Sequence, residues 1–220
     1  MLKIKHFIEQ SWLLIVASFL FGLLIAVTNA GLDQKIRQNE KDKLDKLMKE
    51  LITDANDFAK AIEEVPILGK KGKVIKTDIY KGVDDVNNVT GFAFIASGAG
   101  FADKIKLVIA VDKTCEKFLG FKVLSSNETP GFGSKIAEDE AESEDDFADQ
   151  FKGAPAGKFE LIKTGKAEVR KVIDSQIVAI SGATVSSEAV VKIFNTYFEQ
   201  VKGKIKELLQ KKEQISNDKE

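Results

Sequence analysis

One long apolar stretch near the N-terminus stands out from the otherwise mixed pattern of the chain. The range Gln10–Leu32 holds 23 consecutive residues without a formal charge, and its most apolar part follows Trp12. About 20 helical residues span the hydrocarbon core of a bilayer, because each adds about 1.5 Å along the axis. Trp12 suits the headgroup region at one end of such a span. The pattern predicts a short N-terminal segment at residues 1–11 and a transmembrane helix at residues 12–30.

A cleaved signal peptide is the alternative interpretation of this stretch. Lys3 and Lys5 would form its basic start, and Thr28–Ala30 would be a weak cleavage site. The apolar stretch is long for a signal peptide, which favours a retained anchor. Basic residues lie on both sides of the span, and acidic residues are interleaved with the later ones, so charge alone leaves the orientation open.

The pattern changes after the apolar stretch. Charged residues with apolar ones at mostly helical intervals predict a helical connector at residues 31–66, ended by Pro66 and Gly69–Gly72. Segments rich in β-branched and aromatic residues then predict strands. These segments are Val74–Tyr80, Val89–Ala96, Ile105–Val111, Phe118–Leu124 and, further on, Val172–Ile180.

The last part of the chain has a clear helical period. After Ser186–Ser187, apolar residues recur at steps of three and four, which predicts one helix with a single packed face. The face comprises Val190, Val191, Phe194, Tyr197, Val201, Ile205 and Leu208. Strands grouped before a final helix indicate an α+β fold. We place this domain at residues 67–210 and a flexible tail at residues 211–220.

Composition narrows the classes of function. The chain has 33 basic and 34 acidic residues and a net charge of −1, which argues against a dedicated nucleic-acid binder. It has one Cys, Cys115, and one His, His6, which exclude a disulfide framework, a Cys/His zinc cluster and His-assisted nucleophilic catalysis. Redox chemistry in such a chain would come from a cofactor. Glu138–Asp149 carries eight acidic residues and no basic ones, which favours a solvated helical surface over a docking site for a basic partner.

The strongest local signal is the turn Ser181–Thr184. A strand-like segment is followed by small residues and then by the final helix. Gly182 permits a tight turn, and the free N–H groups and positive dipole end of the helix attract an anion, above all phosphate. Thr184 presents a hydroxyl there, although an ordinary capped turn has the same sequence pattern. No Walker lysine follows the glycine, which argues against a nucleoside triphosphatase loop.

A second signal is the loop Glu128–Lys135. Pro130 and the glycines around Phe132 favour a tight turn with close backbone approach. Phe132 can stack on a planar ring, and Lys135 can favour a reduced, anionic one. The turn Gly98–Phe101 is a weaker signal of the same kind, because a turn between strands needs no further reason.

In this order and spacing, the three motifs resemble the covalent FMN-binding domain family. The family includes the G subunit of the Rnf electron-transport complex and the C subunit of the sodium-translocating NADH:quinone oxidoreductase. The single N-terminal span also matches, so the resemblance covers most of the chain. It implies a transmembrane helix followed by a mixed α/β FMN-binding domain on the extracytoplasmic side of the cytoplasmic membrane.

The resemblance also assigns roles to residues. It implies that Thr184 carries FMN through a phosphoester bond made by a separate flavin transferase. Residues implied to border the phosphate are Ser181, Gly182, Ala183 and Ser187, and those implied to approach the flavin ring are Glu128, Thr129, Gly131, Phe132 and Lys135. The pattern that the transferase recognises usually has an acidic residue six before the threonine, where this chain has Val178.

We expect a membrane-anchored flavoprotein subunit that relays electrons in an ion-translocating complex of the Rnf type. Its expected partners are the other membrane and redox subunits, the flavin transferase and membrane lipid, with no nucleic acid and no metal. For the whole complex, the resemblance implies transfer between ferredoxin and NAD coupled to sodium or proton movement. The alternatives are the C subunit of the quinone reductase, a membrane-tethered binding or assembly module, and a free-standing FMN-domain reductase.

Overall fold

The computed structural model describes residues 2–69, 72–137, 147–163 and 174–217. The chain divides into two compact units, Met1–Lys43 and Leu44–Glu220, which we describe separately. The first unit consists of most of helix α1 (Leu2–Leu51), which continues without a break through the predicted transmembrane segment. The hydroxyls of Ser18 and Thr28 donate to the carbonyls of Leu14 and Leu24, at 2.8 and 2.7 Å.

The helix is suited to a bilayer in length and composition. Its large apolar side chains from Trp12 to Val27 are exposed, and no part of its most apolar stretch is buried. Because the Ser18 and Thr28 hydroxyls bond within the helix, neither leaves a free donor in an apolar environment. The apolar N-terminal helix expected from the sequence is therefore present.

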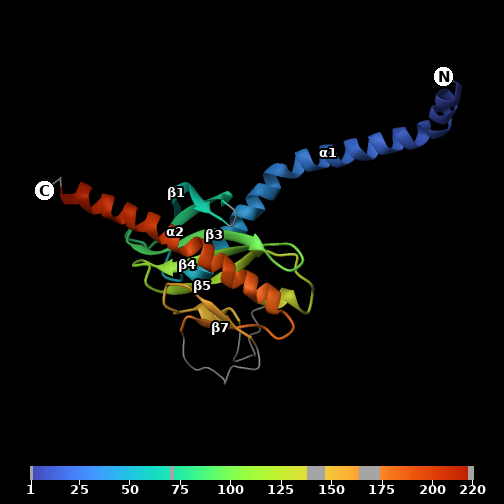
Figure 1. The fold of residues 1–220 in the computed structure, drawn as a ribbon. Helices are drawn as coiled ribbons and strands as arrows, with labels where there is room; N and C mark the ends of the chain where they lie inside the picture. Colours follow the sequence, from blue (N-terminus) through green and yellow to red (C-terminus); the bar gives the residue numbers. More distant parts are fainter. Residues whose placement is uncertain (1, 70–71, 138–146, 164–173, 218–220) are drawn as a thin grey trace. The chain divides into compact units, whose positions relative to one another are not determined.

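The second unit is built on a five-stranded antiparallel sheet (Figure 1). Its strands are β1 (Asp57–Leu68), β2 (Val74–Val83), β3 (Val89–Ala99), β4 (Lys104–Asp112) and β5 (Phe118–Ser125). They are neighbours in chain order, as expected for strands joined by short connections. All four strand segments predicted between residues 74 and 124 lie within β2 to β5.

Strand β1 corrects the prediction of a helical connector at residues 31–66. Helix α1 ends at Leu51, and the following residues 57–68 form an edge strand. Register shifts between Lys60 and Ile62 and between Ile62 and Val65 interrupt the two-residue alternation. These bulges shift the apolar residues away from the strand pattern and toward a helical one. Pro66 is tolerated because β1 is at the edge of the sheet.

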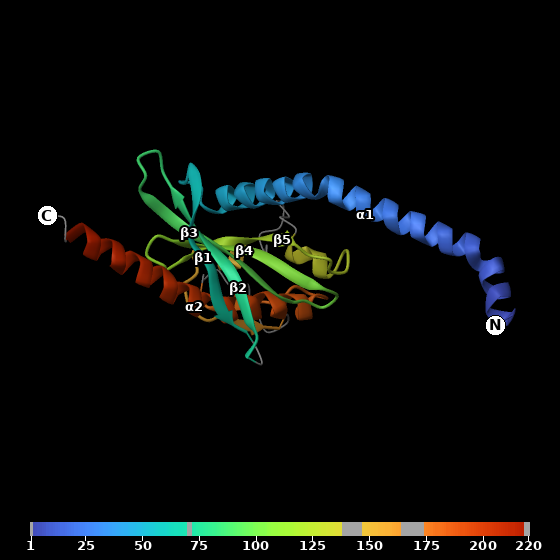
Figure 2. The same cartoon turned by 90° about the horizontal axis from the view of Figure 1, so that it is seen from above.

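The two faces of the sheet pack against different helices. On one face, Ala93, Val108 and Ala110 pack in one core cluster with Met48 and Ile52 from the end of α1 and the segment after it. On the other face, larger side chains from β3 and β4 pack against α2 (Thr184–Asn217); they are Phe92, Phe94, Leu107, Ile109 and Val111. Figures 1 and 2 show α2 running along this face in both views.

Helix α2 confirms the predicted final helix. Every residue of the predicted face is buried except the half-buried Leu208. The helix also continues to Asn217, so residues 211–217, expected as a flexible tail, are helical. This segment is rich in Lys, Glu and Gln, which are good helix formers.

Short elements complete the unit near the start of α2. They are two 3-10 turns, η2 (Gly133–Ile136) and η3 (Asp149–Phe151), and a parallel pair, β6 (Glu160–Ile162) with β7 (Gln176–Val178). Strand β7 lies within the predicted segment Val172–Ile180, of which residues 172–173 are outside the described part of the chain. The acidic segment up to residue 146 is also outside the described residues.

Candidate functional site

The predicted turn before the last helix has the expected geometry. After β7, Gly182 adopts φ +79°, and the Ala183 N–H donates to the Ile180 carbonyl at 3.0 Å. Helix α2 then begins at Thr184. The first N–H groups of a helix have no partner within the helix and lie at its positive end. The turn therefore presents an anion-binding helix terminus next to the threonine hydroxyl.

The hydroxyls in this turn have different environments. Ser186 is buried and donates to the Glu128 carboxylate. Ser187 is buried, donates to the Ala183 carbonyl at 3.0 Å and accepts from the Ile180 N–H at 3.1 Å. Ser181 is exposed and Thr184 is half-exposed, and the Thr184 hydroxyl has no hydrogen bond with any described residue. Among the helical hydroxyls of the first turn, Thr184 alone is left available within the described residues.

The Glu128–Lys135 loop meets this turn through an aromatic ring. The Phe132 ring lies against Gly182, where an added Cβ would be 3.4 Å from its Cδ1 atom. The loop is folded tightly, because Gly131 adopts φ +74° and the Phe132 N–H donates to the Thr129 carbonyl at 3.2 Å. Phe132 remains 58% exposed. An apolar ring face is therefore available close to the start of α2.

Glu128 has a different environment from the rest of its loop. Its carboxylate is buried and accepts hydrogen bonds from the N–H groups of Phe101 at 3.2 Å, Ala102 at 3.1 Å and Asp103 at 3.4 Å, and from Ser186. Burial by itself would raise the pKa of Glu128, but these hydrogen bonds lower it below its usual value. The carboxylate is thus an ionised group that joins three segments of the fold.

The other predicted site residues differ in exposure. Thr129, Gly131 and Lys135 are exposed at the loop surface, and Ala183 is buried beneath the turn. The structure therefore brings Phe132 and the turn of Gly182 together, while Glu128 and Ser187 bond to groups inside the fold. The sequence does not indicate Ser186 as a partner of Glu128, because a serine in a first helical turn has the pattern of a helix cap.

Gln150 also has a role that the sequence did not indicate. Its side-chain amide accepts from the Val178 N–H at 2.7 Å and donates to the Val178 carbonyl at 3.2 Å. This pair of bonds holds β7 two residues before the turn of Ile180–Ala183. No local pattern in the sequence links η3 to β7.

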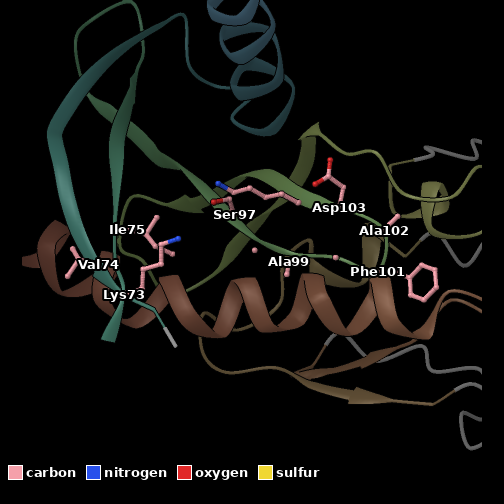
Figure 3. A pocket seen from close by; sticks show the side chains of 11 residues that line it. Lys73, Val74, Ile75, Ser97, Ala99, Phe101, Ala102 and Asp103 are labelled. Carbon is pink, nitrogen blue, oxygen red and sulfur yellow. The ribbon is translucent and has the colours of Figure 1, made fainter. Parts of the chain in front are cut away.

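An open cavity of about 660 Å³ lies where β2 and β3 diverge (Figure 3). The two strands are paired only from Ile79 to Val83 on β2, so the start of β2 and the end of β3 separate. The lining includes Lys73, Val74, Ser97 and the turn from Gly98 to Lys104, with α2 below it in Figure 3. The cavity is therefore lined by the Gly98–Phe101 turn, the weakest of the three sequence motifs. The turn of Thr184 does not line it.

Tyr197 and Gln200 of α2 bond to the backbone of two strands near this divergence, β3 and the edge strand β1. The Tyr197 hydroxyl donates to the Ser97 carbonyl at 3.2 Å. The Gln200 amide pairs with the backbone of Leu68, at 2.8 Å to its N–H and 3.2 Å to its carbonyl. The helix thereby bonds to backbone groups of β3 and of the edge strand β1, whose Leu68 is paired with Val74 at the cavity.

The comparison with known proteins decides the family. Over 192 residues, the chain is 30% identical to the G subunit of the proton-translocating ferredoxin:NAD(+) oxidoreductase complex of Clostridium ljungdahlii, covering 86% of this chain and 88% of that protein. The chain belongs to the family of G subunits of ion-translocating (Rnf) oxidoreductase complexes. The G subunit of the ion-translocating oxidoreductase complex of Methanosarcina acetivorans is 28% identical over 191 residues, covering 86% of this chain and 90% of that protein.

Two further comparisons agree with this family. The family model described as FMN-binding domain matches residues 100–199, which include the Glu128 loop and the turn of Thr184. The crystal structure of NqrC from Shewanella oneidensis has the same fold, with a TM-score of 0.51 at 20% identity, covering 70% of this chain and 72% of that one. The predicted family and the predicted mixed α/β fold are both confirmed.

Proposed function

We propose that this protein carries FMN in phosphoester linkage to Thr184 and relays electrons between other subunits of its complex. The match to an FMN-binding domain covers residues 100–199, so both loops of the candidate site belong to the matched region. The C. ljungdahlii relative is named as part of a proton-translocating ferredoxin:NAD(+) oxidoreductase. That name supports a role in electron transfer between redox subunits.

The observation that carries the proposal is the contrast among the hydroxyls at the start of α2. Ser186 and Ser187 are buried and hydrogen-bonded, whereas Thr184 is half-exposed with no partner among the described residues. A phosphoryl group on the Thr184 oxygen would lie beside the unpaired N–H groups of the first helical turn. The residues present therefore fit a phosphoester.

The surroundings also fit the ring of the cofactor. FMN supplies reversible electron transfer when it is bound. Phe132 offers an exposed aromatic face, and Val185, which follows Thr184 directly, is 51% exposed. Both side chains can pack against a planar ring and exclude water from it. Lys135 supplies a positive charge on the same loop, which stabilises a negative charge on the ring.

In this proposal the protein is an electron carrier and not an independent reductase. The chain has one His, in the N-terminal helix, and its one Cys is buried away from the site. A reductase acting on a small acceptor needs a proton donor at the acceptor. An electron relay needs only a held cofactor and access for partner subunits.

The proposed setting is the cytoplasmic membrane, with the domain on the extracytoplasmic side. The apolar helix α1 supports anchoring, and the family resemblance supports this side. Lipid would contact the apolar side chains of α1, and a flavin transferase would act on Thr184. Val178 occupies the place where an acidic residue is usual for the transferase, and its backbone is bound to Gln150.

The proposal is tested by expressing the full chain in membranes together with a flavin transferase. After denaturing electrophoresis, we expect a fluorescent band from the wild type and from Ser181→Ala, and none from Thr184→Ala. Fluorescence in Thr184→Ala, or its absence from the wild type, contradicts the proposal. If the wild type is not fluorescent but Val178→Asp is, the missing modification is due to poor recognition by the transferase.

A further inference from the structure

The Glu128 carboxylate joins three separate segments of the domain. It accepts hydrogen bonds from the turn after β3, through the N–H groups of Phe101 and Ala102 at 3.2 and 3.1 Å, and from Ser186 in α2. The third segment is its own loop, which ends in the turn that carries Phe132. A buried carboxylate with this many donors is fixed in position, because each bond restrains the same two oxygens.

Glycines give the neighbouring backbone room to approach this carboxylate. A Cβ on Gly133 would lie 2.7 Å from Glu128 Oε2 and 2.7 Å from Ser186 Oγ. A Cβ on Gly100 would lie 2.8 Å from the Asp103 carbonyl oxygen and closer still to Glu128 Oε1. Real Cβ atoms are not found at such distances from their neighbours, so a side chain at either glycine would displace the carboxylate or its donors.

The chemistry of the donors requires an ionised acceptor. Among the described residues, every hydrogen-bond partner of the carboxylate is an N–H or O–H group. A carboxylate has two acceptor oxygens, whereas an amide of the same shape has one acceptor oxygen and an NH₂ group that donates. In either orientation of its amide, glutamine at this position would place its NH₂ group against backbone N–H donors, either that of Phe101 or those of Ala102 and Asp103. A neutral isostere therefore breaks part of the network without leaving a cavity.

We propose that Glu128 is a positioning residue of the flavin site, which fixes the first turn of α2 relative to the Phe132 loop. This inference rests on the proposed attachment of FMN to Thr184. Glu128 acts through Ser186 and through the backbone of residues 101–103, and its carboxylate faces these groups instead of the exposed site. This role replaces the direct approach to the ring that the family resemblance implied.

The test compares Glu128→Gln, Ser186→Ala and the double variant in the full chain. Glu188→Gln is the matched control, because Glu188 is exposed on the same helix and pairs with Lys192 at 2.6 Å. With the flavin transferase, we expect each single variant to be modified about tenfold more slowly than the wild type, the size expected for a lost charge-assisted hydrogen bond. The double variant should be no slower than either single one, and Glu188→Gln should match the wild type.

The midpoint potential of the attached flavin separates positioning from a direct charge effect. Ser186→Ala changes no charge, so a shift in the same direction as in Glu128→Gln supports positioning. A shift in Glu128→Gln alone, or wild-type rates of modification in both single variants, overturns the inference.

A failure of the proposed function itself would be seen separately, as a wild-type chain that is never modified. The network is then tested on the unmodified chain by urea unfolding. Lower midpoints in both single variants, with no further loss in the double variant, support the coupling of Glu128 to Ser186. Additive losses contradict it.

Discussion

The ring of Phe132 lies against Gly182, with the ring Cδ1 atom 3.4 Å from where a Cβ of residue 182 would be. The two residues are 50 positions apart in the chain and belong to separate loops. Gly182 has φ +79°, a backbone conformation that residues with a side chain rarely adopt. The contact joins the loop proposed to hold the flavin ring to the turn proposed to hold its phosphate.

Replacement of Phe132 with Ala should change the flavin environment without unfolding the domain. Because the ring is more than half exposed, we expect the free energy of unfolding to fall by no more than about 0.5 kcal/mol. Quenching of flavin fluorescence by iodide should increase, because the Phe132 ring no longer shields one face of the flavin. Val86→Ala, at another exposed apolar side chain, is the control and should leave quenching unchanged. Unchanged quenching in Phe132→Ala would show that the flavin ring does not lie against Phe132.

Gly98 tests how closely α2 packs on β3. A Cβ at Gly98 would lie only 2.7 Å from Ile193 Cγ1, so Gly98→Ala should lower the free energy of unfolding by about 1–3 kcal/mol. The double variant with Ile193→Ala should lose less than the sum of the two single losses, because the smaller side chain makes room. Urea unfolding measures all three. Additive losses would show that the helix and strand are not in contact there.

The start of the folded domain can be tested by truncation. A chain of residues 44–220 retains Met48 and Ile52, which are buried against the sheet, and strand β1. A chain of residues 67–220 begins at the domain boundary expected from the sequence and lacks both. We expect cooperative urea unfolding from the first chain and aggregation or non-cooperative unfolding from the second, since a buried sheet face is exposed. Equal stability of the two chains would contradict the inclusion of residues 44–66, with β1, in the folded domain.

Cys115 is expected to be unreactive in the folded protein. Its side chain is buried, and burial together with the nearby Asp112 carboxylate raises the pKa of the thiol to about 11. Iodoacetamide at pH 8 should therefore label it slowly, and rapidly in urea. Because the unfolded thiol ionises near pH 9, its contribution to stability is lost as the pH rises from about 9 to 11. Rapid labelling of the folded chain would contradict its burial.

Much of the fold follows from patterns within the sequence. The long apolar stretch, four of the five main strands and the buried face of α2 each have a clear signal in composition or period over many residues. Strand β1 does not, because its bulges disrupt the alternation and Pro66 suggests an end to structure. Its place depends on pairing with β2, which no local pattern records.

The candidate site was predictable in its turns but not in its hydrogen bonds. Gly182 and Gly131 both have positive φ, as the turn motifs imply. The direction of Glu128 was not predictable, because its donors come from residues 101–103 and from Ser186. A carboxylate in a glycine-rich loop has the same sequence pattern whether it faces a ligand or the inside of the fold.

The most direct measurement is the mass of the peptide that contains Thr184, from full-length chain isolated with its flavin transferase. We expect an increase in mass equal to one FMN less one water, with fragmentation that places the added group on the Thr184 side chain. The Thr184→Ala peptide should be unmodified. An added flavin on Ser181, or an unmodified Thr184 in protein that nevertheless binds FMN, would contradict it.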